Sequence, residues 1–454
     1  MGRMSTKYRV QNPKNNEIVE SFDFITDDAL ETALTTANDT FKQWREKSFE
    51  ERAEVLRKVA KLFDEQRSEL TRIIAEEMGK SVKEGDGEIN DVVEIFNYYA
   101  DHGAEFGADE EIPNERGGTS VMRKVPLGVI LGIMPWNFPY YQVARFAAPA
   151  LMAGNVVMVK HAEICPRSAA AIAKIFDEAG APKGLYTNLY AKHSQVSTLI
   201  NDDRVQGVSL TGSERAGRTI ASQAGQALKK CVLELGGTDA YVVLDASDVA
   251  KAAETAWNKR MIVMEDIYDE FVQALVDLAS SYSEGDPLNP GEGNEFYPLS
   301  SRDAAELLAQ QLRLAVEEGA NLRVGGEVTG KGAYITPAVI TDIPVGSDSY
   351  YEEFFGPVAE VYKVSSEEEA IELANDSRYG LGGAVMSEDA ERAKKVAAKV
   401  DTGMIHVNIP QARGAELPFG GVKASGLGRE LGPLGMDEFV NHQRFYVAGS
   451  DSAV

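Results

Sequence analysis

The sequence predicts an α/β protein built from doubly wound, mostly parallel sheets. The run V-P-L-G-V-I-L-G-I-M-P over residues 125–135 is continuously apolar and ends at a proline, which is typical of a parallel strand buried on both faces. Similar short runs alternate with helical stretches through both halves of the chain. At 454 residues, 44% of them hydrophobic, the chain is long enough for two or more packed domains.

The first half begins with a helical region and continues as alternating strands and helices. Residues 6–22 are strand-like around an Asn-Pro turn, 26–100 have helical periodicity, and 104–125 are polar and strand-like. After the apolar run we expect helices over 140–153, 167–179 and 214–227, and strands over 155–160, 205–213 and 231–235.

The second half shows the same alternation of strand-like and helical segments, which predicts a second α/β domain. Its expected helices cover 247–257, 266–282, 302–318, 366–375 and 388–399, and its expected strands cover 260–264, 322–326, 336–341, 382–386 and 403–408.

Composition excludes several functional classes. The net charge of −25, from 71 acidic and 46 basic residues, argues against a nucleic-acid partner, because phosphates require Lys and Arg. The sequence contains no apolar run of about 18 residues, so we expect no membrane-spanning helix. The first residues also lack the apolar segment of a signal peptide. Two cysteines without a C-x-x-C motif are too few for a disulfide framework, so we expect a reduced cytoplasmic compartment and no metal site.

The stretch V-L-E-L-G-G over residues 232–237 predicts a buried strand that enters a Gly-Gly turn and carries Glu234 near its end. A carboxylate buried there would have a raised pKa and could act as a base near neutral pH. The alternative, a strand-end glutamate in water, is the more common situation for such a hexapeptide taken alone.

Three further segments follow predicted strands, where α/β sheets place ligands. In P-W-N-F-P (135–139), the Asn137 amide could donate a hydrogen bond to an oxyanion, although for this segment taken alone an ordinary asparagine in a Pro-bracketed turn is the more common explanation. Lys160 and Glu163 could hold ribose hydroxyls, although surface Lys/Glu pairs are common. L-T-G-S-E-R-A-G (210–217) predicts a phosphate-binding helix N-terminus and is not the G-x-G-x-x-G fingerprint.

Together and in this order, these segments closely resemble the aldehyde dehydrogenase superfamily. The resemblance runs from about Tyr8 to about Val447, and the combination of ILGIMPWNFP, RFAAPALMAGN and KHA is most similar to its succinate-semialdehyde dehydrogenase branch. The matching motifs are PWNFP (135–139), GNVVMVKHAE (154–163), LTGSERAG (210–217), LELGG (233–237), EEFFGPVA (352–359) and LPFGGVKASGLGRE (417–430).

The resemblance implies two Rossmann-like domains plus a small β oligomerisation flap. A cofactor-binding domain would comprise residues 1–107 and 127–235, and a catalytic domain residues 236–437. The flap would comprise the polar strands 108–126 and 438–454, which suit pairing with another subunit. We therefore expect a homodimer or homotetramer.

The implied reaction is oxidation of an aldehyde, in this branch succinate semialdehyde, to its acid with NAD or NADP. A cysteine thiolate attacks the aldehyde, hydride passes to the cofactor, and water hydrolyses the thioester. By motif match Asn137 is the oxyanion-hole amide and Glu234 the general base, and Glu430 matches a second acidic residue near the site. The same match assigns cofactor contacts to Pro135, Trp136, Lys160, Glu163, Gly212, Ser213, Gly217, Leu235, Glu353 and Phe355.

Two residues carry expectations about specificity. Arg145 is similar to an arginine that meets the far carboxylate of the substrate in the succinate-semialdehyde branch, and the alternative is an arginine on a helix surface. Glu163 at the adenosine 2′-hydroxyl would repel a 2′-phosphate, so we expect a preference for NAD, with NADP possible as a cofactor.

The family's nucleophile is missing from this sequence. In the family an N-x-G-Q-x-C loop follows the LELGG glutamate by about 34 residues, and here roughly 13 residues between Trp257 and Arg260 are absent against that spacing. Cys165 and Cys231 do not match the position of the catalytic cysteine. Two hypotheses stay open: an active dehydrogenase whose natural chain contains the loop, or a catalytically dead member that still binds NAD or serves as a structural subunit.

Overall fold

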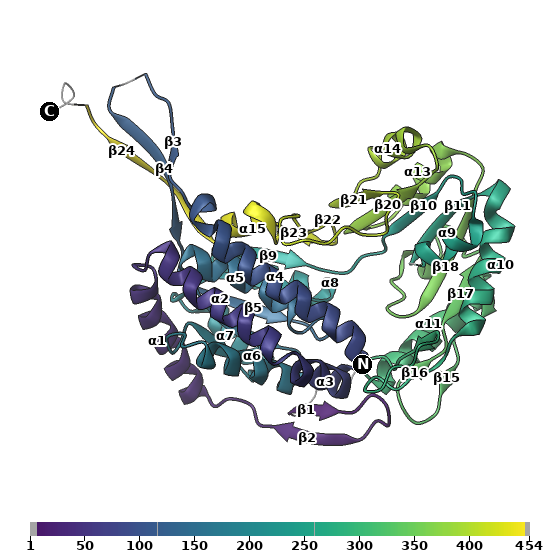
Figure 1. Ribbon diagram of the computed structural model, residues 1–454, viewed down its shortest axis with the longest axis horizontal. Helices are drawn as coiled ribbons and strands as arrows, with labels where there is room; N and C mark the ends of the chain where they lie inside the picture. The colour runs from purple at the N-terminus through teal and green to yellow at the C-terminus, as the bar shows by residue number, and fades with distance from the viewer. Residues whose placement is uncertain (1–6, 116, 258, 450–454) are drawn as a thin grey trace.

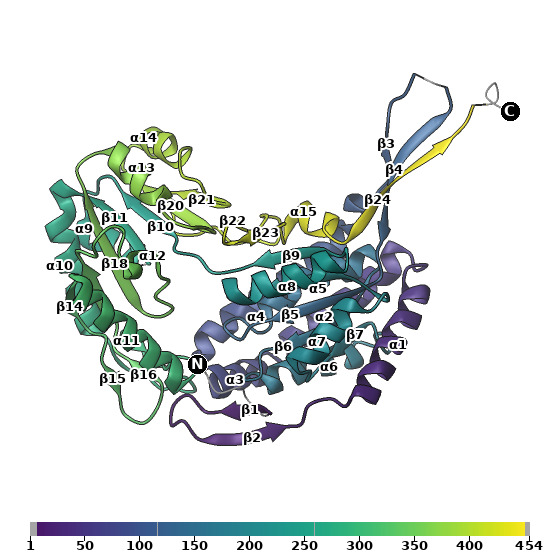
Figure 2. The ribbon, with the colours of Figure 1, turned by 180° about the vertical axis from the view of Figure 1, so that it is seen from behind.

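The computed structural model describes residues 7–449 except 116 and 258, and it contains two α/β lobes (Figures 1 and 2). The α/β class with Rossmann-like sheets is confirmed. The parts of the predicted domains that lie at residues 1–6 and 450–454 are outside the described residues. The division into domains after residues 107, 126, 235 and 437 stays a prediction.

The sheet of the first lobe has the strand order β23-β9-β8-β5-β6-β7, and all its pairings are parallel except β23 with β9. Its central strands are fully or almost fully buried, as the apolar runs predict. The strands are β5 (Val129–Met134), β6 (Val156–His161), β7 (Tyr186–Asn188), β8 (Val205–Thr211), β9 (Lys230–Glu234) and β23 (Gly426–Leu427).

Helices of the first half gather around this sheet (Figure 1). Side-chain caps set several of their starts: Ser48 and Glu51 form a reciprocal capping box on α2, and Ser81 and Glu84 form another on α4. The helices are α1 (Asp27–Trp44), α2 (Phe49–Glu65), α3 (Arg67–Met78), α4 (Val82–Phe106), α5 (Tyr141–Ala153), α6 (Pro166–Glu178), α7 (His193–Asn201) and α8 (Glu214–Gln226), and the strands β1 (Tyr8–Gln11) and β2 (Ile18–Phe22) form a separate hairpin.

The sheet of the second lobe has the order β14-β17-β18-β11-β10-β20-β21, and β14 alone among its described strands runs antiparallel to its neighbour. Its strands are β10 (Ala240–Val243), β11 (Arg260–Met264), β14 (Asn321–Val324), β17 (Ala338–Thr341), β18 (Val358–Val364), β20 (Gly382–Met386) and β21 (Met404–Val407). Its helices are α9 (Val249–Ala256), α10 (Glu265–Ser281), α11 (Arg302–Glu318), α12 (Asp348–Tyr351), α13 (Glu367–Asn375) and α14 (Ala390–Ala397).

The chain returns to the first lobe near its end. Leu431, Met436 and Phe439 belong to the hydrophobic core of the first lobe, and α15 (Gly432–Asp437) packs against α5. Four minor strand pairs surround the sheets: β12 (Ser283–Glu284) with β13 (Glu295–Phe296), β15 (Val328–Thr329) with β16 (Tyr334–Ile335), and β19 (Tyr379–Gly380) with β22 (Val422–Lys423), besides β1 with β2.

A flap of β24 (Val440–Val447), β4 (Thr119–Pro126) and β3 (Glu110–Glu111) projects from the first lobe (Figures 1 and 2). The expected apolar run over residues 125–135 is in fact divided: β4 ends at Pro126, and β5 starts at Val129 after Gly128, whose φ is 150°. The glycine permits this change of direction from flap to buried sheet. Within the described residues, no helix has the length and apolar character needed to cross a membrane.

Candidate active site

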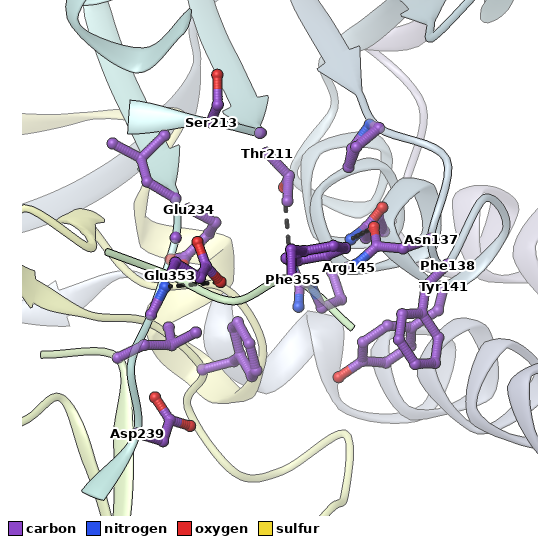
Figure 3. A pocket seen from close by; sticks show the side chains of 18 of the residues that line it. Asn137, Phe138, Tyr141, Arg145, Thr211, Ser213, Glu234, Asp239, Glu353 and Phe355 are labelled. Carbon is purple, nitrogen blue, oxygen red and sulfur yellow. Dashed lines mark hydrogen bonds between the residues drawn. The ribbon is translucent and has the colours of Figure 1, made fainter. Parts of the chain in front are cut away.

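A cavity of about 530 Å³ lies where the carboxyl ends of β5, β8 and β9 face the second lobe. This is the edge at which parallel sheets place ligands. Most of the residues predicted for the site line it, and Figure 3 shows Asn137 and Glu234 reaching it from opposite sides. The predicted residues that line it are Pro135, Trp136, Asn137, Arg145, Gly212, Ser213, Glu234, Leu235, Glu353 and Phe355.

Glu234 is the last residue of β9 and is 2% exposed. Its carboxylate is therefore buried and does not lie in water at the strand end. Its strand is held on both sides, because Glu234 pairs with Thr211 of β8 and with Gly426 of β23. Neither carboxylate oxygen has a hydrogen-bond partner among the described residues. Burial, with a further contribution from the charge of Glu430, raises the pKa of Glu234 well above its ordinary value, which suits a general base.

Arg145 is buried in α5 rather than exposed on a helix surface, which removes the alternative interpretation. Its Nε lies 2.7 Å from a carboxylate oxygen of Glu430, and both side chains are 3% exposed. The guanidinium also lies 4.0 Å from the centroid of the Phe419 ring and donates from Nη2 to Thr211 Oγ1 at 3.5 Å. Arg145 therefore presents a fixed positive charge to the cavity while its own charge is balanced by Glu430.

Asn137 follows β5 in the Pro-bracketed turn, and its side-chain orientation is set by one contact. Gln142 Nε2 donates to Asn137 Oδ1 at 2.9 Å. Because the oxygen is engaged in this way, the amide NH2 of Asn137 is left to donate toward a ligand. This arrangement fits the predicted oxyanion-hole function.

The N-terminus of α8 forms a suitable cradle for the pyrophosphate of a dinucleotide. Ser213 caps α8 by accepting a hydrogen bond from the backbone of Ala216 at 3.3 Å, next to Gly212. Gly217 is in close contact with Leu235, since a Cβ built on it would lie 2.6 Å from the Leu235 methyl groups. Backbone N–H groups and the helix dipole at such a terminus favour a phosphate, so these residues fit a nicotinamide dinucleotide.

Lys160 and Glu163 lie at the end of β6, beyond the residues that line the cavity. Lys160 Nζ lies 2.7 Å from Glu163 Oε1, and the His193 ring nitrogen lies 3.5 Å from the same oxygen. Burial by itself would raise the pKa of Glu163, but the charge and hydrogen bond of Lys160, with smaller contributions from a backbone N–H and His193, together lower it. The pair would present an anion and a cation together to the adenosine end of a cofactor.

Glu353 has a partner that sequence patterns did not reveal. Lys259, just before β11, forms an ion pair with Glu353 and donates from Nζ to the carbonyl of Gly237 at 2.8 Å. Phe355 is 49% exposed, and its ring meets Trp136 edge-on with the centroids 5.8 Å apart. Lys259 is thus placed beside the residues predicted to hold the nicotinamide end of the cofactor.

Neither cysteine of the chain lines the cavity. Cys165 is fully buried at the start of α6, where burial raises the pKa of its thiol well above the ordinary value. Cys231 lies within β9, where burial raises the pKa of its thiol to about 11. The expectation that neither replaces the family's nucleophile agrees with both placements. The link from Ala256 to Arg260 is short, and Asn258 within it is outside the described residues.

This fold and site define a nicotinamide-dependent oxidoreductase of aldehydes. Residues 2–445 match the Aldehyde dehydrogenase family, and the chain belongs to that family.

Among its relatives, the succinate-semialdehyde dehydrogenase [NADP(+)] of Deinococcus radiodurans is 45% identical, with 97% of this chain and 95% of the relative covered. The succinate semialdehyde dehydrogenase [NAD(P)+] Sad of Escherichia coli is 38% identical, with 95% and 96% covered. A solved structure of succinic semialdehyde dehydrogenase from Streptococcus pyogenes in complex with NADP+ has a TM-score of 0.94 at 42% identity and covers 97% of this chain and 100% of that one.

These comparisons confirm the predicted family and the nicotinamide cofactor. The names of these relatives carry NADP(+) or NAD(P)+, and the preference for NAD over NADP stays a prediction.

Sequence reasoning did not find Lys259, Gln142 or Phe419 as parts of the site. Gln142 stands five residues after Asn137 on the next helix, and that spacing was the one available signal. Lys259 has no sequence signal of this kind, and its place in the site follows from its ion pair with Glu353.

Proposed function

We propose that this protein oxidises succinate semialdehyde to succinate with NADP or NAD. One observation carries the proposal: a buried, fixed guanidinium and a buried, unpartnered carboxylate line the same cavity of about 530 Å³. Arg145 would bind the carboxylate end of the substrate, and Glu234 would accept a proton at the carbonyl end. The names of the relatives support this substrate.

Each group of residues in the site would have its own role in binding or catalysis. Asn137 would donate to the carbonyl oxygen and stabilise the negative charge that develops on it. The α8 N-terminus with Ser213 would hold the pyrophosphate, and Glu353 would hold a ribose. When bound, the oxidised nicotinamide supplies the acceptor for the hydride that the aldehyde carbon loses.

The test compares an acidic aldehyde with a neutral one. Purified protein is mixed with NADP or NAD and either succinate semialdehyde or butanal, and formation of the reduced cofactor is followed at 340 nm. We expect a higher kcat/KM for succinate semialdehyde, because only this aldehyde carries a carboxylate for Arg145.

Arg145→Lys should reduce that preference, since lysine keeps the charge but loses the planar fork. Arg52→Lys is the matched control, because Arg52 is also buried but bonds to backbone carbonyls away from the cavity. Equal kcat/KM for both aldehydes in the unmodified protein would contradict the substrate assignment. The absence of any reduced cofactor from folded protein would favour the catalytically dead alternative, which the relatives' names do not support.

We also propose that the flap mediates a homodimer or homotetramer. Phe445, Tyr446 and Val447 of β24 are between 43% and 50% exposed on a strand that projects from the body (Figure 2). Exposed apolar side chains on an extended strand favour burial against a second copy. Size-exclusion chromatography with light scattering should show more than one chain, and a single-chain mass at micromolar concentration would refute the proposal.

A further inference from the structure

A buried carboxylate of the first lobe contacts the start of α6, the helix that follows Lys160 and Glu163. Glu77 lies one residue before the end of α3 and is 1% exposed. Its Oε1 accepts a hydrogen bond from the backbone N–H of Arg167 at 2.6 Å. Its Oε2 accepts from the backbone N–H of Ser168 at 3.0 Å and from the Ser168 hydroxyl at 2.7 Å. Because α3 packs against α6 (Figures 1 and 2), Glu77 caps the N-terminus of a helix other than its own.

Helix α6 depends on this contact because its own first residues provide no cap. Cys165, which precedes α6, makes no side-chain cap hydrogen bond, and Pro166 at the first helical position has no N–H. The next two N–H groups are those of Arg167 and Ser168, and both donate to Glu77. By contrast, α2, α4, α8 and α11 are capped by a serine of their own segment. The donors of α6 and its helix dipole offset the cost of burying the Glu77 carboxylate.

The turn 162–165 joins β6 to α6 and carries Glu163. Its first residue, Ala162, donates from its backbone N–H to the Met134 carbonyl at 2.9 Å, and the Glu163 carbonyl accepts from the Arg9 N–H at 2.9 Å. These bonds fix the turn on its strand side, and Glu77 fixes it on its helix side. Because the turn is short, a displacement of the start of α6 would change the orientation of the Glu163 side chain.

We propose that Glu77 is a positioning residue for the adenosine end of the nicotinamide cofactor, because its cap on α6 fixes the turn 162–165 and holds Glu163 beside Lys160. The inference rests on the proposed function for the cofactor and for the place of its adenosine ribose. It adds a residue that does not line the cavity and that acts through the backbone of α6.

The ionisable side chains that face Glu77 come from three neighbouring segments. Arg167 on α6 carries a positive charge and is paired with Glu20 and Glu76. The other facing groups are Tyr140 before α5, Cys165 before α6 and Tyr190 after β7. Burial raises the pKa values of Tyr140 and Cys165 well above their ordinary values and that of Tyr190 to about 12. These three groups therefore stay neutral at the pH at which Glu77 titrates.

The cap on α6 should weaken as the pH falls. Burial raises the pKa of Glu77 to about 7, although the donors of Ser168 and the N–H and charge of Arg167 oppose this effect. The ionised carboxylate accepts from both backbone N–H groups, whereas a protonated carboxyl carries a hydroxyl and loses part of this capacity. The affinity for the adenosine end should therefore decrease as the pH falls through about 7.

The experiment measures the binding of ADP-ribose, which carries the adenosine and pyrophosphate of the cofactor without the nicotinamide. Isothermal titration calorimetry compares the unmodified protein with Glu77→Gln at about pH 8, where Glu77 is ionised. We expect the variant to bind ADP-ribose roughly fivefold more weakly, the factor that corresponds to a lost helix cap. Glu88→Gln is the matched control, because Glu88 is also buried and accepts from the backbone of Tyr140 and Tyr141 at the start of α5. Its loss should leave the affinity for ADP-ribose unchanged.

A pH profile of the same binding separates positioning by Glu77 from a general loss of structure. His193 is a second titratable group beside Glu163, so the profile is recorded in a His193→Gln background. It runs from about pH 6 to 8, a range in which ADP-ribose has no titrating group. With Glu77 the affinity should decrease up to roughly fivefold toward the acidic end, and with Glu77→Gln it should stay constant. Ser168→Ala removes a donor to the ionised carboxylate, so it should move the midpoint to higher pH.

Three outcomes would overturn the inference: unchanged affinity in Glu77→Gln, an equal loss in Glu88→Gln, or the same pH profile with and without Glu77. Should Glu77→Gln fail to fold, an unmoved midpoint in Ser168→Ala would overturn it as well.

Glu163→Ala separates the inference from the proposed function on which it rests. Weaker binding of ADP-ribose in Glu163→Ala, with unchanged binding in Glu77→Gln, would refute the inference alone. Unchanged binding in Glu163→Ala would refute the proposed place of the adenosine ribose, and the inference would be refuted with it. The expected binding results in a protein that reduces neither NADP nor NAD would support the inference and refute the proposed reaction.

Discussion

Replacing Arg145 by methionine should destabilise the protein strongly, because it leaves Glu430 buried without its counter-charge. The Arg145 Nε and a Glu430 oxygen lie 2.7 Å apart with both side chains 3% exposed. At an effective dielectric constant of 20 their gross attraction is about 6 kcal/mol, and removing one partner of a buried pair typically costs about 3–5 kcal/mol. Burial raises the pKa of Glu430, so protonation of the orphaned carboxyl limits the loss toward the lower end.

The assay is a double-mutant cycle in urea. Arg145→Met, Glu430→Gln and the double variant are unfolded at pH 7.5 and followed by tryptophan fluorescence, and the free energies of unfolding are compared. We expect the double variant to recover at least about 2 kcal/mol relative to Arg145→Met, since an uncharged pair needs no compensation. The loss in Arg145→Met should also shrink at pH 5, where Glu430 is more easily protonated. A loss below about 1 kcal/mol, or a double variant no more stable than Arg145→Met, would refute this account of the buried pair.

Three further predictions concern the cofactor and pH. Glu163→Gln should increase the ratio of NADP to NAD affinity about tenfold, because it removes the negative charge beside Lys160; an unchanged ratio of dissociation constants in calorimetry would contradict this. Lys259→Met should tighten NADP binding several-fold in the same assay, since Glu353 is released for the ribose, and weaker binding would show that Lys259 itself contacts the cofactor. Burial raises the pKa of Glu360 to about 8, so between about pH 4.5 and 8 the folded state keeps a proton that the unfolded state releases. The free energy of unfolding should therefore fall with rising pH in this range by up to about 1.4 kcal/mol per pH unit. Glu360→Gln should flatten that decline in urea titrations, and an unchanged slope would exclude Glu360 as its cause.

Much of the fold was accessible from periodicity because the buried strands are short, apolar and separated by amphipathic helices. The strand expected over residues 260–264 is β11, and the helix expected over 302–318 is α11, each with the same bounds. The apolar run over residues 125–135 predicts one strand, but the structure has two, because apolar composition alone does not show where the chain leaves one sheet and joins another. Gly128, with a φ of 150°, marks that point, and a single glycine is a weak signal in a sequence.

The candidate site was predictable where motifs follow strands, as for Asn137 and Glu234. Burial of Arg145 beside Glu430 was not predictable in this way, because the two residues are far apart in the sequence and meet only through packing of the C-terminal segment. The same holds for Lys259 and Glu353, whose pairing depends on the length of the α9–β11 link. Electrostatic partners that are far apart in the sequence leave no periodic trace in it.

The return of the C-terminal segment to the first lobe has a consequence for biosynthesis. The strand that carries Glu234 acquires its outer neighbour, β23, only after the whole second lobe has been made, and Tyr99 donates to the Gly432 carbonyl across 333 residues of sequence. Contacts of such separation form late, because the loop between them must close first. On the ribosome the first lobe would therefore wait with an open sheet edge beside Glu234, and the segment that carries β23 would both close that edge and complete the site.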